Sequence, residues 1–346
     1  MSKSAGHSTS LFVAPKWMKI EPRNTDTRQR NSMQYRTLGR TDLKVSLLSQ
    51  GTGGPSQFGQ KRGLFQAEQN RLIRRCLDLG INLFDTHETY GDSEAILGRA
   101  LDGVPRDDYI LVTKWAYPRD GDPTGDPGEL TRAVERSLRR LNTDHIDVML
   151  FHGLLAEHHD MVVERYMPVL EHLRERGLVG HRGFSLRYIV DPAQCGATAG
   201  LRKTPDLWDV IMLKYGILNQ HAAKEMLPLA IQHNIGILNM AAVRIKLPNP
   251  KLLEETIADW KSRGLIPQDA LSDKDPLGWL VRDDVESIIA AAYKFAADHP
   301  AISSVITGTS NLAHLESNVH AMRNPALDPA DSTRLKRLFG HIVEYA

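Results

Sequence analysis

Residues 109–151 read YILVTKWAYPRDGDPTGDPGELTRAVERSLRRLNTDHIDVMLF and contain the clearest structural unit of the chain. The stretch begins with an apolar run of strand length at 109–114 and ends with another at 146–151. Between them, large apolar side chains recur every three or four residues, at Leu130, Val134, Leu138 and Leu141. That period is typical of one face of an α-helix. The sequence therefore predicts a strand, a helix and a second strand, which is the repeating unit of α/β folds.

The same alternation continues on both sides of this unit. Strand candidates lie at 47–51, 81–85, 109–114, 146–151, 179–185, 207–213, 235–240 and 302–306. Most are apolar along their whole length, as strands are when helices cover both faces of a parallel sheet. Eight such units over roughly 290 residues fit a (β/α)8 TIM barrel better than an open, doubly wound sheet. The sequence thus predicts a single-domain barrel of the α/β class.

Two segments fall outside the alternation. Residues 1–30 are polar, without a sustained apolar period, and are predicted to form a mobile N-terminal arm. The barrel, as the catalytic domain, is predicted to span 31–346. Within it, residues from about 247 to 282 carry four prolines around one helical stretch and are predicted to be an insertion after the seventh strand. Loops at that end of a barrel strand commonly bind substrate.

The composition excludes several classes of protein. The 346 residues include 43 Lys and Arg against 42 Asp and Glu, a formal charge of +1, which argues against nucleic acid or an anionic membrane as a partner. Cys76 and Cys195 are too few for a disulfide framework and fit a reducing compartment. No apolar run reaches the roughly 18 residues of a membrane helix. We therefore expect a cytoplasmic protein, and the sequence leaves its oligomeric state open.

Charged or titratable side chains stand at the ends of three consecutive strand candidates. Asp85 ends the second candidate, Lys114 ends the third, and His152 directly follows the fourth. Tyr90 lies five residues after Asp85, in the next loop. Active sites of barrels lie at the carboxyl ends of the strands. We therefore expect these four side chains to meet at one rim.

These four residue types suit proton transfer to or from an oxygen atom. A free phenol has a pKa of about 10 and is a weak acid at neutral pH, but a neighbouring ammonium group lowers that pKa. Lys114 would supply the ammonium group and Asp85 its counter-ion, since a buried charge needs a partner. His152 would donate a hydrogen bond to an oxygen that gains negative charge. Such a site can protonate an alkoxide or deprotonate an alcohol, and it needs a separate hydride carrier.

Six stretches of the chain resemble the aldo-keto reductase superfamily. They are YRTLGRT at 35–41, GTGG at 51–54, NLFDTHETYGDSE at 82–94, LVTK at 111–114, DVMLFH at 147–152 and ITGTSNLAHLESN at 306–318. The resemblance runs from about residue 35 to the C-terminus. It implies a (β/α)8 barrel that binds NADPH or NADH without a Rossmann fold. It also implies a catalytic tetrad of Asp85, Tyr90, Lys114 and His152.

The resemblance further implies where the cofactor binds. The matching positions are Ser185, Gly308, Thr309, Ser310, Asn311, His314 and Asn318. Leu186, Met212 and Met240 stand where the family usually has an asparagine, a glutamine and an aromatic side chain. The turn at 308–311 lacks a Lys or Arg for the 2′-phosphate of NADPH. We therefore predict that NADPH and NADH bind within about tenfold of each other.

The predicted function is the interconversion of a small-molecule carbonyl (aldehyde, ketone or sugar) and an alcohol by hydride transfer, with Tyr90 as general acid or base. The altered cofactor positions leave one alternative open, a non-catalytic barrel that binds a nucleotide and reports redox state to a partner protein. A metal hydrolase that uses His87, His152 and His181 is a second alternative. It is disfavoured because each histidine is isolated in the sequence and Lys114 would repel a cation, so no metal is predicted.

Overall fold

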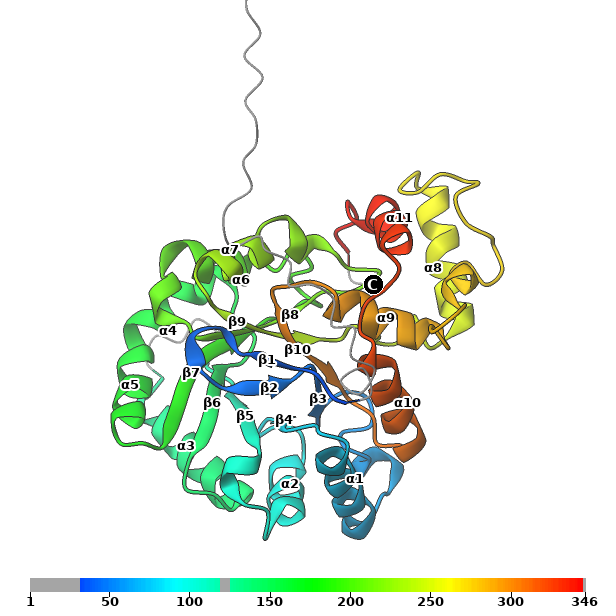
Figure 1. Ribbon diagram of the computed structural model, residues 1–346. Coiled ribbons are helices and arrows are strands. Elements are labelled where there is room, and N and C mark those ends of the chain that lie inside the picture. The colour runs from blue at the N-terminus through cyan, green and yellow to red at the C-terminus, as the bar shows by residue number, and fades with distance from the viewer. Residues whose placement is uncertain (1–31, 119–124, 345–346) are drawn as a thin grey trace, which may run out of the picture.

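The computed structural model of the protein describes residues 32–118 and 125–344 (Figure 1). Eight parallel strands close into a barrel in the order β10-β3-β4-β5-β6-β7-β8-β9. Their bounds are β3 Leu48–Gly51, β4 Leu83–Asp85, β5 Ile110–Trp115, β6 Ile146–Phe151, β7 Val179–Ser185, β8 Val210–Lys214, β9 Gly236–Met240 and β10 Ile302–Thr307. The predicted (β/α)8 barrel is confirmed. The arm predicted for 1–30 lies outside the described residues.

Helices cover the outside of the barrel (Figure 1). Those at or near predicted positions are α1 Gln66–Asp78, α2 Ser93–Leu101, α3 Gly128–Leu141, α5 Met167–Glu175, α7 Met226–Gln232, α8 Pro250–Ser262 and α10 Leu312–Arg323. The sequence did not predict α4 His159–Arg165, α6 Cys195–Lys203, α9 Ile288–Ala297 and α11 Pro329–Phe339. Nearly every residue of α9 is buried, so this helix lacks the one-sided apolar pattern of a surface helix.

Apolar side chains fill the inside of the barrel. One buried cluster contains Leu38, Val45, Leu83, Ile110, Val112, Val148, Leu150, Val210, Met212 and Leu238. Burial of a leucine or valine side chain stabilises a fold by about 1.5–3 kcal/mol. A second, larger cluster packs the helices against the outer faces of the strands. The barrel is therefore a packed core rather than a pore.

An antiparallel hairpin, which the sequence did not predict, closes the amino end of the barrel. It consists of β1 (Tyr35–Thr37) and β2 (Lys44–Ser46), and its turn begins with the fully buried Leu38. Gly236 begins β9 with so little room that a Cβ there would lie 2.7 Å from the Leu38 side chain. Figure 1 shows the hairpin (blue) across the barrel. Because this end is closed, the site must form at the carboxyl end of the strands.

The segment between β9 and α9 contains α8 and a short 3-10 turn at Gly278–Leu280. Trp260 of α8 is only 1% exposed, and its ring lies 5.7 Å from that of Phe339 in α11. Its Nε1 also donates a hydrogen bond to Glu344 Oε2 at 2.9 Å. Through these contacts α8 (yellow in Figure 1) packs against α11 and the residues that follow it.

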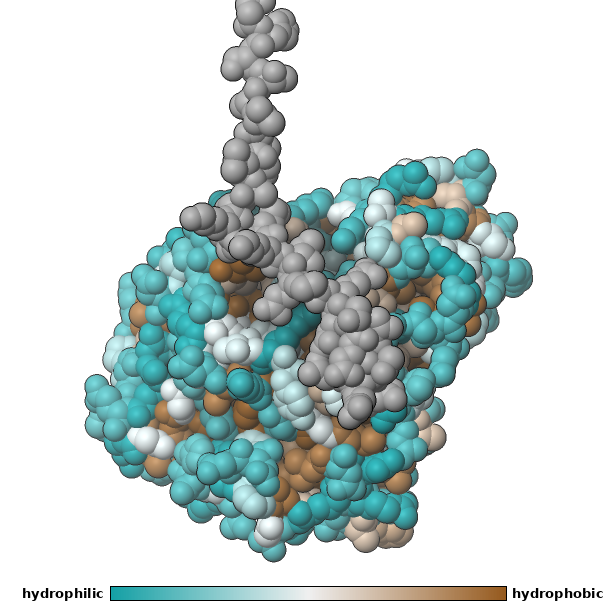
Figure 2. Space-filling model, in the orientation of Figure 1, coloured by the Kyte–Doolittle hydropathy of each residue, from teal (hydrophilic) through white to brown (hydrophobic). Residues whose placement is uncertain are grey.

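The face seen in Figure 2 is mostly hydrophilic, with hydrophobic side chains exposed in separate patches. Scattered exposed apolar residues are normal on protein surfaces. Among the described helices, none combines the length and the hydropathy that crossing a membrane would require.

Candidate active site

The predicted tetrad lies at the carboxyl end of the barrel. Asp85 is the last residue of β4, Lys114 is next to last in β5, and His152 directly follows β6. Tyr90 lies in the loop between β4 and α2. Asp85 pairs in register with Val112, two residues before Lys114, so the ends of these neighbouring strands meet at one rim.

Asp85 and Lys114 form a buried ion pair. Lys114 Nζ donates hydrogen bonds to Asp85 Oδ1 at 2.5 Å and to the Thr86 carbonyl oxygen at 2.8 Å. Only 2% of the lysine side chain and 8% of the aspartate side chain are exposed. Burial raises the pKa of Asp85 despite the neighbouring ammonium group. Burial alone would lower the pKa of Lys114, but the acidic groups around it, Asp85 first, hold that pKa above its usual value.

The Tyr90 ring contacts both Lys114 and the loop after β3. Its centroid lies 5.2 Å from Lys114 Nζ. A Cβ at Gly53 would lie 2.5 Å from the ring, so only glycine leaves room for it. The Tyr90 N–H donates to the His87 carbonyl oxygen at 3.0 Å, which closes a tight turn before α2. The structure thus brings Tyr90, Lys114 and Asp85 together.

One histidine, His87, lies beside the tyrosine, and a second, His152, lies beside His87. The ring centroids of His152 and His87 are 4.2 Å apart, with an angle of 57° between the ring planes. The His87 ring also lies 5.1 Å from the Tyr90 ring, edge to face, and its Nδ1 is 2.7 Å from Thr89 Oγ1. From the sequence, His87 enters only the metal-hydrolase alternative, although it belongs to the motif at 82–94. Its place between the two tetrad rings depends on the turn before α2, which the sequence does not specify.

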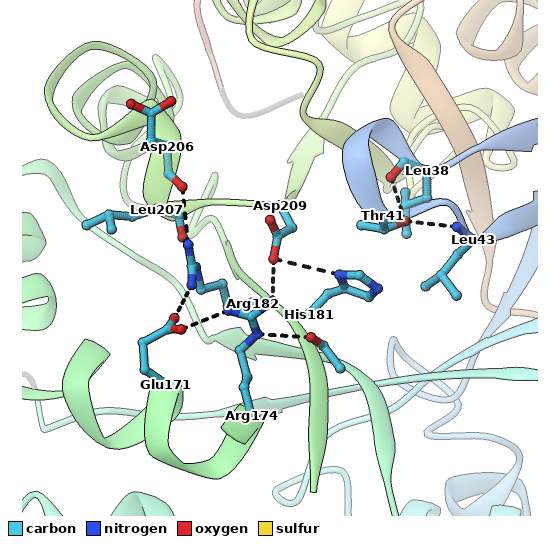
Figure 3. A network of polar contacts seen from close by, with 11 residues as sticks. Leu38, Thr41, Leu43, Glu171, Arg174, His181, Arg182, Asp206, Leu207 and Asp209 are labelled. Carbon is cyan, nitrogen blue, oxygen red and sulfur yellow. Dashed lines mark hydrogen bonds and ion pairs between the residues drawn. The ribbon is translucent and has the colours of Figure 1, made fainter. Parts of the chain in front are cut away.

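The structure separates the histidines of the metal-hydrolase alternative. His181 lies in β7, four residues before the carboxyl end of that strand, or about 13 Å at the usual rise per residue. Its Nδ1 is 3.8 Å from Asp209 Oδ2, in the polar network around Arg182 (Figure 3). The alternative of a metal site formed by His181, His87 and His152 is therefore wrong. Across the described ranges, no three His, Cys, Asp or Glu side chains group as metal ligands would.

The turn after β10 leads into α10 and offers groups that bind anions. Asn311 caps the helix through Oδ1, which accepts from the His314 N–H at 3.1 Å, and its own N–H donates to Thr309 Oγ1 at 3.1 Å. Ser310 Oγ is buried and has no hydrogen-bond partner among the described residues. Gly308 and His314 are exposed. The first N–H groups of a helix lack partners within it, and together with the helix dipole they favour a phosphate group.

Two further predicted cofactor residues are hydrogen-bonded within the protein. Asn318 Nδ2 donates to Thr307 Oγ1 at 3.1 Å, and the Tyr293 hydroxyl donates to the same oxygen at 2.9 Å. Ser185 Oγ accepts a hydrogen bond from the Gly153 N–H at 3.1 Å. Asn318 therefore holds the end of β10 against α10, and Ser185 holds the loop after β6 against the end of β7.

Apolar side chains occupy the positions that depart from the family pattern. Leu186 and Met212 are 4% and 2% exposed, and the Leu186 N–H donates to the Met212 carbonyl oxygen at 3.1 Å. Met240 ends β9 and is half-buried. These side chains can pack against a ring, but they offer no hydrogen-bond donor to a carboxamide. These three positions are therefore apolar, although Ser185 and Lys214 end the neighbouring strands β7 and β8.

A basic pocket formed by Lys214, Arg244 and Lys246 lies at the same end of the barrel and was not predicted. Lys214 Nζ and the Arg244 guanidinium carbon lie 4.9 and 5.6 Å from the centroid of the Tyr188 ring. Burial, together with the charges of Arg244 and Lys246, lowers the pKa of Lys214 to about 7. Arg244 Nε is buried and has no hydrogen-bond partner in the part of the chain that the structure describes. Lys214 ends an apolar strand as Lys114 nearly does, so the rule that found Lys114 could have found it.

Known proteins are similar to this chain over most of the barrel. A model described as the Aldo/keto reductase family matches residues 51–339. L-galactose dehydrogenase of Arabidopsis thaliana is 28% identical over 304 residues, which cover 84% of this chain and 88% of the relative. NADH-specific methylglyoxal reductase of Escherichia coli is 26% identical, over 87% of this chain and 97% of the relative. The holo form of an aldo-keto reductase from Bacillus halodurans is 26% identical with a TM-score of 0.66, over 90% of this chain and 98% of that one.

The matched residues include the strands and loops that carry the tetrad and the turn after β10. The three proteins described above are named as reductases or dehydrogenases. The chain therefore belongs to the aldo/keto reductase family and is an oxidoreductase of the kind that uses NAD(P)H.

Proposed function

We propose that this enzyme interconverts an aldehyde, ketone or sugar carbonyl and the corresponding alcohol, with NADPH or NADH as the hydride carrier and Tyr90 as general acid or base. The observation that carries the proposal is the buried Lys114–Asp85 pair with the Tyr90 ring 5.2 Å from the ammonium nitrogen. The attraction between a buried positive charge and a nearby phenolate is stronger than in water, because the local dielectric constant is low.

Each tetrad residue has one task in this proposal. In the reductive direction Tyr90 gives its hydroxyl proton to the carbonyl oxygen, and in the oxidative direction it takes that proton back. Lys114 stabilises the phenolate that is left behind, and Asp85 holds the lysine side chain in place. His152 orients the carbonyl by a hydrogen bond to its oxygen. A bound nicotinamide nucleotide supplies the hydride to the carbonyl carbon, or accepts it in the reverse reaction.

The residues present fit the phosphate groups of such a nucleotide. The unpartnered Ser310 Oγ and the first N–H groups of α10 would bind one phosphate group. Arg244 Nε, which has no hydrogen-bond partner among the described residues, would donate to another phosphate group beside Lys214 and Lys246.

The nicotinamide end is expected to rest on a more apolar surface than the family usually offers. Ser185 would offer a hydroxyl group to the nicotinamide end of the cofactor. The thioether of Met240 would pack against the nicotinamide ring in place of an aromatic side chain. This surface is compatible with a nicotinamide ring, whose binding would depend more on packing than on hydrogen bonds to the carboxamide.

We propose small aldehydes and sugars as the first substrates to test, because the relatives include an L-galactose dehydrogenase and a methylglyoxal reductase. We also propose that the protein works in the cytoplasm, since the thiols of Cys76 and Cys195 are free, as in a reducing compartment.

The test is a spectrophotometric assay at 340 nm. Purified protein is mixed with NADPH or NADH and a panel of aldehydes, ketones and aldoses, and with NADP or NAD and the corresponding alcohols and sugars. We expect turnover of at least one aldehyde or sugar. Binding of either cofactor with no turnover across the panel would refute the proposal and would favour the non-catalytic alternative.

A further inference from the structure

The loop between β3 and α1 lies against the loop that carries Tyr90. Ser93 Oγ donates a hydrogen bond to the Thr52 carbonyl oxygen at 3.2 Å, and the side chain of Gln60 makes further hydrogen bonds between them. Gln60 Nε2 lies within hydrogen-bond distance of three acceptors, which are the Gln57 carbonyl oxygen in its own loop at 2.8 Å, Ser93 Oγ at 2.9 Å and the Tyr90 carbonyl oxygen at 3.0 Å. Gln60 Oε1 accepts a hydrogen bond from the Asp92 N–H at 2.8 Å. We propose that Gln60 is a positioning residue that fixes Tyr90 for proton transfer. The inference rests on the proposed role of Tyr90.

The chemistry of this contact requires an amide side chain. The loop at 90–93 presents acceptors at Tyr90 and Ser93 but a donor at Asp92, so its partner must donate and accept at once. Glutamine does both, whereas a carboxylate only accepts and an ammonium group only donates. The length is also matched, because Gln60 reaches across from the neighbouring loop.

The opposite face of the contact is shaped to receive the amide. Gly91 has a φ of +59°, in the left-handed region that glycine adopts most easily. A Cβ at Gly91 would lie 2.6 Å from Gln60 Oε1. Any other residue there would therefore push the amide away from the Tyr90 loop.

The loop that carries Gln60 is itself firmly held. Phe58 is 1% exposed, and its carbonyl oxygen accepts a hydrogen bond from Gln69 Nε2 at 3.0 Å. Gln57, Phe58 and Gly59 all have positive φ, of 44°, 57° and 84°. Two consecutive non-glycine residues in that region are costly, and such backbone persists only where its surroundings over-determine it. Because this loop is rigid, Gln60 can hold the loop that carries Tyr90 in one position.

Loss of the contact should therefore affect the reaction more than the fold. Tyr90 would keep its tight-turn bond to His87 and its ring contact with Lys114, but its backbone would lose the link to the loop after β3. Misplacement of a reacting group by about 1 Å can cost about 100-fold in rate.

The test compares Gln60→Ala with a matched control, Gln66→Ala. Gln66 is also half-buried and donates to a carbonyl oxygen, that of Ile96, at 3.1 Å. Its other side-chain hydrogen bonds among the described residues join it to Asn70 and Arg99, outside the Tyr90 loop. We expect Gln60→Ala to lower kcat by about 10- to 100-fold, with KM and cofactor Kd within threefold of wild type. Gln66→Ala should keep the wild-type kcat. Equal activity of Gln60→Ala and wild type would overturn the inference.

A second readout does not depend on turnover. The Asp92 N–H is held by Gln60, so its hydrogen exchange should become at least about tenfold faster in Gln60→Ala and stay unchanged in Gln66→Ala. Unchanged exchange in Gln60→Ala would also overturn the inference. An inactive wild type with both cofactors would refute the proposed function and the positioning role together, whereas an active wild type with an equally active Gln60→Ala refutes the inference alone.

Discussion

Replacement of Lys114 by methionine should destabilise the protein as well as stop turnover. Methionine nearly preserves the volume of the side chain, but it leaves the Asp85 carboxylate, 8% exposed, without the ammonium group now 2.5 Å away. Removal of one partner from a buried ion pair typically costs about 3–5 kcal/mol. We expect the free energy of unfolding of Lys114→Met at pH 8 to fall by about that amount.

The loss should depend on pH with a definite sign. Burial raises the pKa of Asp85 even beside Lys114, and removal of the lysine raises that pKa further. Between the raised pKa of Asp85 in the wild type and its still higher value in the variant, the folded variant binds a proton that the folded wild type does not. The stability of the variant relative to wild type should therefore decrease as the pH rises through this window.

Urea unfolding at pH 5 and pH 8 measures both effects. The double variant Asp85→Asn, Lys114→Met removes the stranded charge and should recover most of the loss at pH 8. Lys294→Met is a matched control, because Lys294 is 1% exposed and pairs with Asp284 at 2.8 Å. Asp284 is 53% exposed and can stay hydrated, so this variant should lose less stability and keep the wild-type kcat. A loss in Lys114→Met below about 1 kcal/mol at pH 8, or an equal loss in the double variant, would refute the reasoning.

Cofactor affinity should weaken as the pH rises above 7, because Lys214, with a pKa of about 7, loses its charge. Fluorescence titrations of NADPH at pH 6 and pH 8.5 should show this change in the wild type and not in Lys214→Met. An affinity of the wild type that does not change with pH would contradict the role of the basic pocket. Leu38→Ala should lower the free energy of unfolding by about 3–5 kcal/mol in chemical denaturation, since the leucine is fully buried at the closed end of the barrel; a loss below about 1 kcal/mol would contradict that packing. The Kd values of NADPH and NADH, titrated at pH 7, should differ by less than about tenfold; a hundredfold preference that persists in His314→Ala would place the determinant elsewhere.

The barrel strands could be predicted because helices cover them on both sides, which leaves continuous apolar runs in the sequence. The strand predicted at 146–151 matches β6 and that at 179–185 matches β7. The strand predicted at 207–213 begins three residues too early. Leu207 ends a 3-10 turn and the fully buried Trp208 packs against the Phe184 ring, so these apolar residues belong to the core without belonging to β8.

The tetrad could be located from the sequence because each member follows a strand or lies within one motif. Lys214 ends β8 and could have been found by the same rule. Its grouping with Arg244 and the Gln60 contact could not, because Arg244, Gln60 and Tyr90 lie in loops that meet their partners only in the folded chain. Lys214 and Arg244 are 30 residues apart, and so are Gln60 and Tyr90. Helix α9 was missed for another reason, since a helix buried on nearly all sides shows no apolar stripe.

Hydride transfer in Tyr90→Phe isolates the contribution of the phenol oxygen. Phenylalanine keeps the ring against Gly53 and near Lys114, and removes only the hydroxyl group. Stopped-flow absorbance at 340 nm, with enzyme and cofactor in excess over the best wild-type substrate, measures a single turnover. The rate should fall by about 10²- to 10⁴-fold while cofactor Kd stays within about twofold of wild type. A variant that retains more than about a tenth of the wild-type rate would show that another group transfers the proton.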